Sequence, residues 1–333
     1  FVHTVAAGYV TGAVFVLAIS SWYLLKGRDL GFARRSFAIA SAFGMASILS
    51  VIILGDESGY EIGDVQKTKL AAIEAEWHTE PAPAAFTLFG LPNQAEQRTD
   101  YAVKIPYVMG IIATRSLDTQ VTGIKDLIKQ HELRIRNGIK AYALLEKLRS
   151  GEKTPENLAA FNQHKQDLGY GLLLKKYTPA VVDASEAQIK QAALDTIPNV
   201  ATVFWSFRLM VASGFLMLAL FACAFWASAR KNEEKKRWLL KWALFSLPLP
   251  WIAAQTGWLV AEHGRQPWSI AEVLPVHLST STISAADVWG SLLALLAFYS
   301  VLLVIEMYLM IKFARLGPSS LHTGRYHFEQ QPA

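Results

Sequence analysis

Three side chains that can bind iron lie at similar depths in three apolar segments of this 333-residue chain. Measured along a helix, His3 and Met210 lie about 33 Å and about 28 Å before the basic ends of their segments, and Glu262 lies about 36 Å beyond the basic start of its own. Imidazole and thioether are the soft axial pair of a six-coordinate haem. A lone carboxylate can hold a second, five-coordinate iron. These residues therefore permit haem chemistry, although a histidine at a span end is more often interfacial and a methionine more often packs.

Glu262 and three further ionisable side chains lie in or beside these apolar segments, where charge is costly and often functional. Arg208 is either a partner for haem propionates or a side chain that extends to the membrane surface. Glu262 and Arg265 form either a site or a solvated helix end. Glu306 is either an acid on a proton path or a hydrogen-bonding group between helices. Residue type and spacing leave these alternatives open.

Five segments are long and apolar enough to position these groups across a bilayer, which takes roughly 20 residues each. They cover residues 1–25, 36–55, 200–229, 238–261 and 288–311. Pro248 and Pro250 predict a kink in the fourth. We therefore expect an all-α, polytopic transmembrane bundle with one large, mainly helical loop outside the membrane. Its expected parts are residues 1–55 (two spans), 56–198 (loop), 199–316 (three spans) and 317–333 (tail).

The composition agrees with this division and excludes several classes of protein. The chain is 52% hydrophobic but only 18% charged, against about 25% in soluble domains. The net charge of +5 comes with no basic run interleaved with aromatics, so nothing indicates nucleic-acid binding. A single cysteine, Cys223, excludes disulfides, covalent haem attachment and thiolate zinc sites. Phe1 lies within an apolar run without a basic leader, which predicts that further chain precedes it.

Lysine and arginine in the short connections predict the orientation, because cytoplasmic loops are enriched in both. Basic side chains cluster in the first connection, the third connection and the tail: Lys26, Arg28, Arg34, Arg35, Arg230, Lys231, Lys235, Lys236, Arg237, Lys312, Arg315 and Arg325. The connection at residues 262–287 contains only Arg265. We therefore expect the long loop outside the membrane and the C-terminus in the cytoplasm.

Within the long loop, two stretches predict helices. Apolar residues recur at helical spacing from Ile124 to Leu145. Ser185 and Gln188 have the spacing of a capping box, which predicts a helix through residue 192. Four prolines predict irregular stretches between residues 81 and 106: Pro81, Pro83, Pro92 and Pro106.

The segment GWLVAEHGRQPW, residues 257–268, resembles the GWxxAExGRQPW signature of cytochrome bd oxidase subunit I. Similar segments follow the family's order along nearly all of the chain: FVHTVA at residues 1–6, GDESG at 55–59, QKTKLAAIEAEW at 66–77, FRLM at 207–210, FARLGP at 313–318 and TGRY at 323–326. Several ordered matches are far more specific than one. The chain resembles the C-terminal portion of this subunit in its long Q-loop form, without the family's first four spans.

The resemblance implies which residues bind haem. His3 and Met210 would be the axial ligands of a low-spin haem b, and Glu262 would ligate a high-spin haem b. Three further residues would lie beside the haems: Arg208, Arg265 and Trp258. Trp258 is equally plausible as a packing residue. The ligand of the family's haem d would lie outside this chain.

The resemblance also implies a quinol site at Lys69 and Glu74, with Gln66 close by. A spacing of five residues puts Lys69 and Glu74 about 140° apart on an ideal helix. They would therefore need a substrate between them or a distorted helix to act together. Without the resemblance, both would be taken for the solvated face of an amphipathic helix.

The function implied is a quinol:oxygen oxidoreductase, which oxidises ubiquinol or menaquinol outside the membrane and reduces oxygen to water. Glu74 would accept a proton and Lys69 would hold the head group. Implied partners are subunit II, a small single-span subunit and membrane lipid. One alternative is a non-redox transporter or sensor whose outer domain binds a ligand, with Arg208 and Glu306 on its path. A b-type subunit of another quinol-oxidising complex would need paired histidines, and His3 is the only histidine in the five spans.

Overall fold

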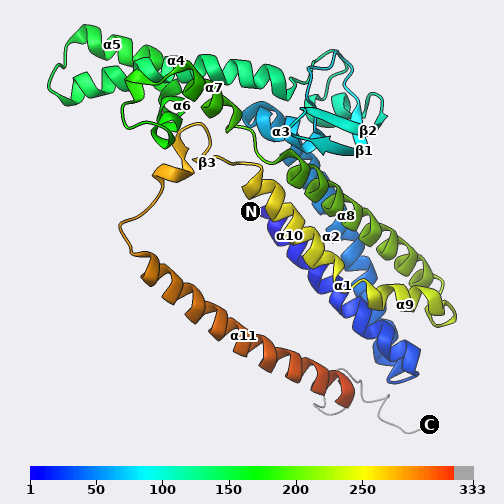
Figure 1. Ribbon diagram of the computed structural model, residues 1–333. Helices are drawn as coiled ribbons and strands as arrows, with labels where there is room; N and C mark the ends of the chain where they lie inside the picture. The colour runs from blue at the N-terminus through cyan, green and yellow to red at the C-terminus, as the bar shows by residue number, and fades with distance from the viewer. Residues whose placement is uncertain (319–333) are drawn as a thin grey trace. The chain divides into compact units, whose positions relative to one another are not determined.

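The computed structural model describes residues 1–318 as two compact units (Figure 1). Unit 1 contains residues 1–53, 213–252 and 281–318, and unit 2 contains residues 54–212 and 253–280. Five helical segments are long and apolar enough to cross a membrane: α1 (Val2–Lys26), α2 (Leu30–Val65), α8 (Val200–Ala229), the segment Arg237–His263 and α11 (Ala285–Leu316). The predicted number of spans and the all-α class are confirmed. The resemblance at residues 323–326 lies outside the described residues.

Two of the spans differ in detail from a simple apolar rod. Helix α2 continues to Val65, well beyond the end of its apolar run at residue 55, because helical hydrogen bonds do not require apolar side chains. The fourth span is broken, as its prolines predict. Helix α9 (Arg237–Phe245) ends before a turn at residues 246–248, α10 (Leu249–Trp258) follows, and a π-helix continues over residues 259–263.

Unit 1 is held together by close packing between helices. Helix α1 packs along α9, and the rings of Tyr9 and Phe43 lie 5.5 Å apart between α1 and α2. Gly44 of α2 meets Phe221 of α8 so closely that an added Cβ would lie 2.1 Å from the ring. Glycine is therefore what permits this approach of the two helices.

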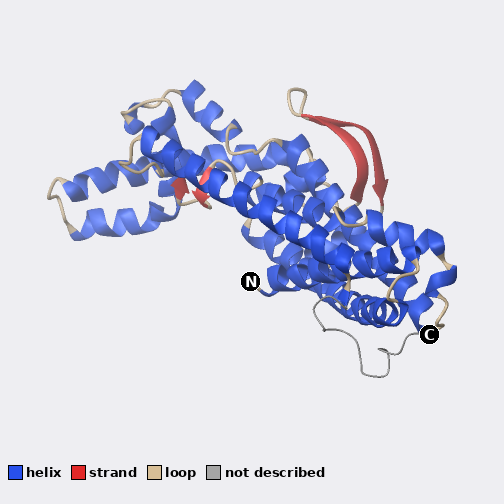
Figure 2. Cartoon of the chain, turned by 90° about the horizontal axis from the view of Figure 1, so that it is seen from below, coloured by secondary structure: helices blue, strands red, loops and turns tan. Residues whose placement is uncertain are grey.

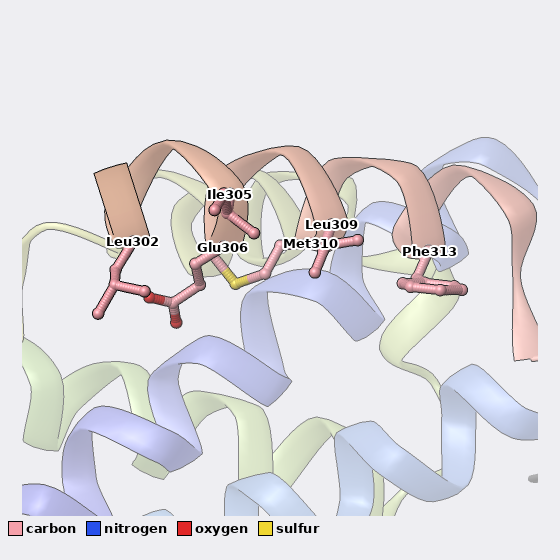
Figure 3. A pocket seen from close by; sticks show the side chains of 6 residues that line it. All are labelled: Leu302, Ile305, Glu306, Leu309, Met310 and Phe313. Carbon is pink, nitrogen blue, oxygen red and sulfur yellow. The ribbon is translucent and has the colours of Figure 1, made fainter. Parts of the chain in front are cut away.

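Glu306 lies in unit 1, on the long helix α11. Figure 3 shows it with five neighbours that line one hollow: Leu302, Ile305, Leu309, Met310 and Phe313. All six side chains come from α11 itself, and among residues 1–318 Glu306 has no hydrogen-bonding partner on another helix. Both interpretations of Glu306, an acid on a proton path and a hydrogen-bonding group between helices, stay predictions.

Unit 2 has a helical core built mainly from the long loop. Its helices are α3 (Lys67–Glu74), α4 (Ile124–Arg149), α5 (Pro155–His164), α6 (Leu168–Leu172) and α7 (Glu186–Leu194). Helix α4 buries much of the predicted apolar face, including Ile124, Leu127 and Ile135, against α6 and α7. The capping box at Ser185 is present, with both reciprocal hydrogen bonds. Both helices predicted within the loop are confirmed.

Unit 2 also contains two small antiparallel sheets that the sequence pattern did not predict. Strands β1 (Phe86–Asn93) and β2 (Arg98–Ile105) form a hairpin, drawn in red in Figure 2. Pro92 lies inside β1, where an irregular stretch was expected. It is tolerated because it lies one residue from the strand end of a two-stranded sheet, where its missing N–H need not break a ladder. Strands β3 (Trp268–Ile270) and β4 (Leu274–Pro275) form the second pair.

Candidate functional site: a buried acid and the residues around it

Glu74 is the last residue of α3 and is 2% exposed. The helix ends there because Ala75 takes a left-handed conformation, with φ 50°, and its N–H donates to the carbonyl of Ala72. The Glu74 carboxylate turns towards the hairpin and accepts the backbone N–H of Thr87 at 3.0 Å. The helix end and β1 together therefore place one carboxylate in the interior of unit 2.

Arg208 supplies the charge opposite Glu74. Its Nη2 lies 3.4 Å from the Glu74 carboxylate, and it also donates to the Thr87 carbonyl. The other guanidinium N–H groups donate to backbone carbonyls of three elements: Ile73 at 2.7 Å, Phe204 at 3.1 Å and Leu88 at 3.2 Å. A guanidinium has five N–H donors, and all five have protein acceptors here. No donor of Arg208 is left over for a haem propionate in this arrangement. The role of Arg208 beside a haem propionate stays a prediction.

Burial dominates the chemistry of Glu74. It raises the pKa of this carboxyl to about 7, while Arg208 and the Thr87 N–H lower the pKa and Glu76 raises it further. A carboxyl with a pKa near 7 is half ionised at neutral pH, which is the condition under which a general base is most effective. Glu74 can therefore both accept and release a proton.

Next to Glu74 lies a cluster that the sequence did not predict, formed by Glu76, Glu80 and Lys104. The Lys104 ammonium lies 2.9 Å from Glu76 and also pairs with Glu80. Glu76 is buried, whereas the side chains of Lys104 and Glu80 are 33% and 24% exposed. No sequence pattern in β2, whose residues read RTDYAVKI, indicates that Lys104 lies beside residues 24 and 28 positions earlier in the chain.

Lys69 lies on α3 but contacts a different element from Glu74. Its Nζ donates to the carbonyl of Ala261 at 3.0 Å, beside the ion pair of Glu262 and Arg265. Burial and the nearby Arg265 lower the pKa of Lys69, and Glu262 opposes them. The two predicted quinol residues thus point to different partners, as their spacing of five residues implies. Gln66 is the N-cap residue of α3 and is half-buried.

Two more predicted haem residues, Met210 and Trp258, lie elsewhere in unit 2. The Sδ atom of Met210 lies beside Gly257, where an added Cβ would be only 3.1 Å from the sulfur. Gly257 therefore permits the sulfur to lie close to the backbone of α10, and a side chain at this position would press against the thioether. Trp258 follows in α10 and is 60% exposed. His3 belongs to unit 1, in the first turn of α1, and its Nδ1 is buried without a hydrogen-bonding partner among residues 1–318.

No group of three or more His, Cys, Asp or Glu side chains within residues 1–318 is arranged to hold a bare metal ion. His3 and Met210 offer the imidazole and thioether donors that a haem iron accepts. Arg265 indicates an anionic group nearby, such as a haem propionate, because its Nε is buried and has no acceptor among the described residues. These donors and the buried Nε of Arg265 fit haem and its propionate groups.

The spans and the buried ionisable groups define the class: a multi-pass helical membrane protein. A family model for cytochrome bd terminal oxidase subunit I matches residues 1–318. The chain belongs to this family, and it is accordingly a multi-pass protein of the inner membrane. Since cytochromes are haem proteins, the family also implies haem as the cofactor.

Curated relatives agree with this family, and a solved structure shares the fold. The chain is 47% identical over 323 residues to cytochrome bd-II ubiquinol oxidase subunit 1 of Escherichia coli strain K12, with 97% of this chain and 63% of that one covered. It is 26% identical over 318 residues to cytochrome bd ubiquinol oxidase subunit 1 of Bacillus subtilis strain 168, with 95% and 56% covered. The bd oxidase structure from Geobacillus thermodenitrificans matches the fold with a TM-score of 0.64 at 24% identity, covering 95% of this chain and 57% of that chain. The chain thus spans about three-fifths of the length of these proteins.

Proposed function

We propose that this chain oxidises quinol and holds two haems of a terminal quinol oxidase that reduces oxygen to water. The observation that carries the proposal is Glu74, a buried carboxyl with a pKa of about 7 at the end of α3. Oxidation of a quinol releases protons together with electrons, so a base of this kind is what the reaction requires. Family membership and the ubiquinol oxidase names of the relatives support the same conclusion.

In this proposal Glu74 accepts a proton from the quinol hydroxyl at its Oε atoms. Arg208 keeps the carboxylate ionised often enough to act and holds it against the hairpin. Lys69 and Gln66 orient the quinol head group from the start of α3. Lys69 contacts Ala261, whereas Glu74 contacts Thr87 of the hairpin. The quinol would therefore reach from one of these contacts to the other, because the two side chains do not lie next to each other. Ubiquinol and menaquinol both fit this chemistry.

The haem ligands proposed are His3 and Met210 for a low-spin haem b and Glu262 for a high-spin haem b. The soft thioether of Met210, which lies against Gly257, supports one, and the single carboxylate of Glu262 supports the other. Arg265 would contact a haem propionate through its unpaired Nε, and Trp258 offers an exposed ring in α10. When bound, the haems supply the electron-transfer and oxygen chemistry. The haem d ligand would come from outside this chain.

We further propose that the long loop is extracytoplasmic and the C-terminus cytoplasmic. The distribution of Lys and Arg in the short connections supports this orientation. Protons from quinol would then be released outside while protons for water come from inside, which generates a membrane potential. Subunit II, a small single-span subunit and membrane lipid are the proposed partners.

The test is a Glu74→Gln variant of the full-length enzyme. Glutamine keeps the size and can still accept the Thr87 N–H, but it cannot take up a proton at neutral pH. Quinol oxidation should fall by roughly two to four powers of ten, with the haem spectrum unchanged. A purified protein without pigment would refute the oxidase itself, and full activity in this variant would refute Glu74 as the base.

A further inference from the structure

A strained residue lies on the turn between β3 and β4, ten residues beyond Glu262. Glu272 has φ 62°, a left-handed conformation that side-chain-bearing residues rarely adopt. Its carboxylate accepts two hydrogen bonds, from Arg134 Nη1 at 2.7 Å and from the Tyr170 hydroxyl at 3.1 Å. Two residues of the loop's helical core therefore hold this turn in place.

Arg134 is itself fixed by α6 and the turn before it. Its Nε donates to Asp167 at 2.7 Å, and its guanidinium lies 4.1 Å from the centre of the Tyr170 ring. Gly169 in α6 approaches the turn so closely that an added Cβ would lie 2.0 Å from the Glu272 carbonyl oxygen. Tyr170 also contacts Trp268 of β3, with ring centres 5.2 Å apart. The β3–β4 turn is thus held by a close backbone contact, an aromatic contact and charged hydrogen bonds.

The segment between Glu262 and strand β3 is short and contains several local hydrogen bonds. The Gln266 side chain donates to the Glu262 carbonyl at 3.2 Å, and the backbone N–H of Gln266 donates to the His263 carbonyl at 3.2 Å. The N–H of Trp268 donates to the Arg265 carbonyl at 3.1 Å. Successive tight turns transmit position well, because they leave few free backbone dihedrals between their ends. The position of the β3–β4 turn therefore constrains the helix end that carries Glu262.

We propose that Arg134 and Glu272 are positioning residues for Glu262. They hold residues 264–276 against α4 and α6, and so fix the carboxylate of Glu262 relative to its iron. This inference rests on the proposed role of Glu262 as the ligand of the high-spin haem b. The long loop would then have a second role besides binding quinol. Its helical core holds residues 264–276, and Lys69 of α3 binds the Ala261 carbonyl just before them.

Helix α4 offers a matched control two residues away. Arg136 also forms a partly exposed ion pair, in which Nη1 and Nη2 each lie 2.6 Å from a carboxylate oxygen of Glu186 in α7. Its hydrogen bonds go to α7 and not to residues 264–276. Arg134→Met and Arg136→Met remove the same charge from the same helix. Any general loss of stability from losing an arginine should therefore occur in both variants.

The experiment measures hydrogen–deuterium exchange and the reduced-minus-oxidised spectrum of the full-length enzyme. Loss of hydrogen bonds to a charged group changes an opening equilibrium by roughly one to two powers of ten. Arg134→Met should therefore speed exchange in residues 264–276 by at least about tenfold and shift the high-spin haem b band, with the low-spin band unchanged. Arg136→Met should do neither. Glu272→Gly, which removes the carboxylate but accepts the left-handed backbone, should reproduce Arg134→Met.

Two results would overturn the inference. Equal exchange of residues 264–276 in Arg134→Met and Arg136→Met would show that the ion pair does not hold the segment. Faster exchange with an unchanged high-spin band would show that the segment does not position Glu262. A Glu262→Gln variant separates this inference from the proposed function. If that variant keeps its high-spin band, the ligand assignment itself is wrong, whatever the exchange data show.

Discussion

Removal of the Arg208 charge should shift the pH dependence of quinol oxidation towards alkaline pH. The Glu74 carboxyl has a pKa of about 7 because burial raises it more than Arg208 lowers it. At 3.4 Å, a unit charge pair is worth about 5 kcal/mol at an effective dielectric constant of 20. Desolvation and screening leave a shift of roughly 1–3 pKa units for an acid beside an arginine. Without Arg208, the pKa of Glu74 should therefore lie between about 8 and about 10.

The sign of the effect follows from the ionised fraction of Glu74. A base acts only when it is deprotonated, so a higher pKa lowers the rate at a fixed pH below it. At pH 7 the ionised fraction would fall from about one half to about one tenth or less, which is a loss of at least about fivefold in rate. The loss should disappear as the pH is raised through the new pKa.

The assay compares Arg208→Met with Arg208→Lys in the full-length enzyme, between pH 5.5 and pH 9.5. Rates are expressed per haem, so that loss of protein does not count as loss of activity. Arg208→Lys loses most of the backbone hydrogen bonds but keeps the charge, and its pH profile should stay close to that of the parent. A carboxylic-acid band in infrared difference spectra, assigned with Glu74→Gln, gives the pKa independently. A profile of Arg208→Met that is unshifted or displaced to acid pH would refute the reasoning.

Three further predictions follow from neighbouring contacts. In the parent protein the Glu76 charge raises the pKa of Glu74 and the Lys104 charge lowers it. Glu76→Gln should therefore move the midpoint of the pH profile to lower pH, and Lys104→Met should move it to higher pH. Shifts of the same sign in both variants would contradict this. Gly257→Val should remove the low-spin haem b band, as should Met210→Leu, because a side chain at Gly257 would press against the Met210 sulfur; a low-spin band kept in both variants would exclude Met210 as a ligand. Gly138→Ala should destabilise the loop by a few kcal/mol, roughly the cost of overpacking, since its Cβ would lie 2.3 Å from the backbone of α6; an unchanged unfolding midpoint would contradict the close packing.

The sequence by itself determined the spans, the break in the fourth span and the two main helices of the loop. These features depend on local properties: the length of an apolar run, proline, helical spacing and the capping box at Ser185. The family resemblance likewise came from contiguous residues, above all the segment at 257–268. Local interactions encode such features, and they can therefore be read without knowing the fold.

The partners of the candidate site were decided only by the tertiary structure. Arg208 lies 134 residues from Glu74 in the sequence, and the two meet because a hairpin, itself not predicted, closes against α3 and α8. Lys104 joins Glu76 and Glu80 in the same way, and Glu272 reaches Arg134 across 138 residues. Which charge lies beside which depends on how elements pack, and this packing also provides the burial that brings the pKa of Glu74 to about 7. Residue types alone carry neither the contact nor the desolvation.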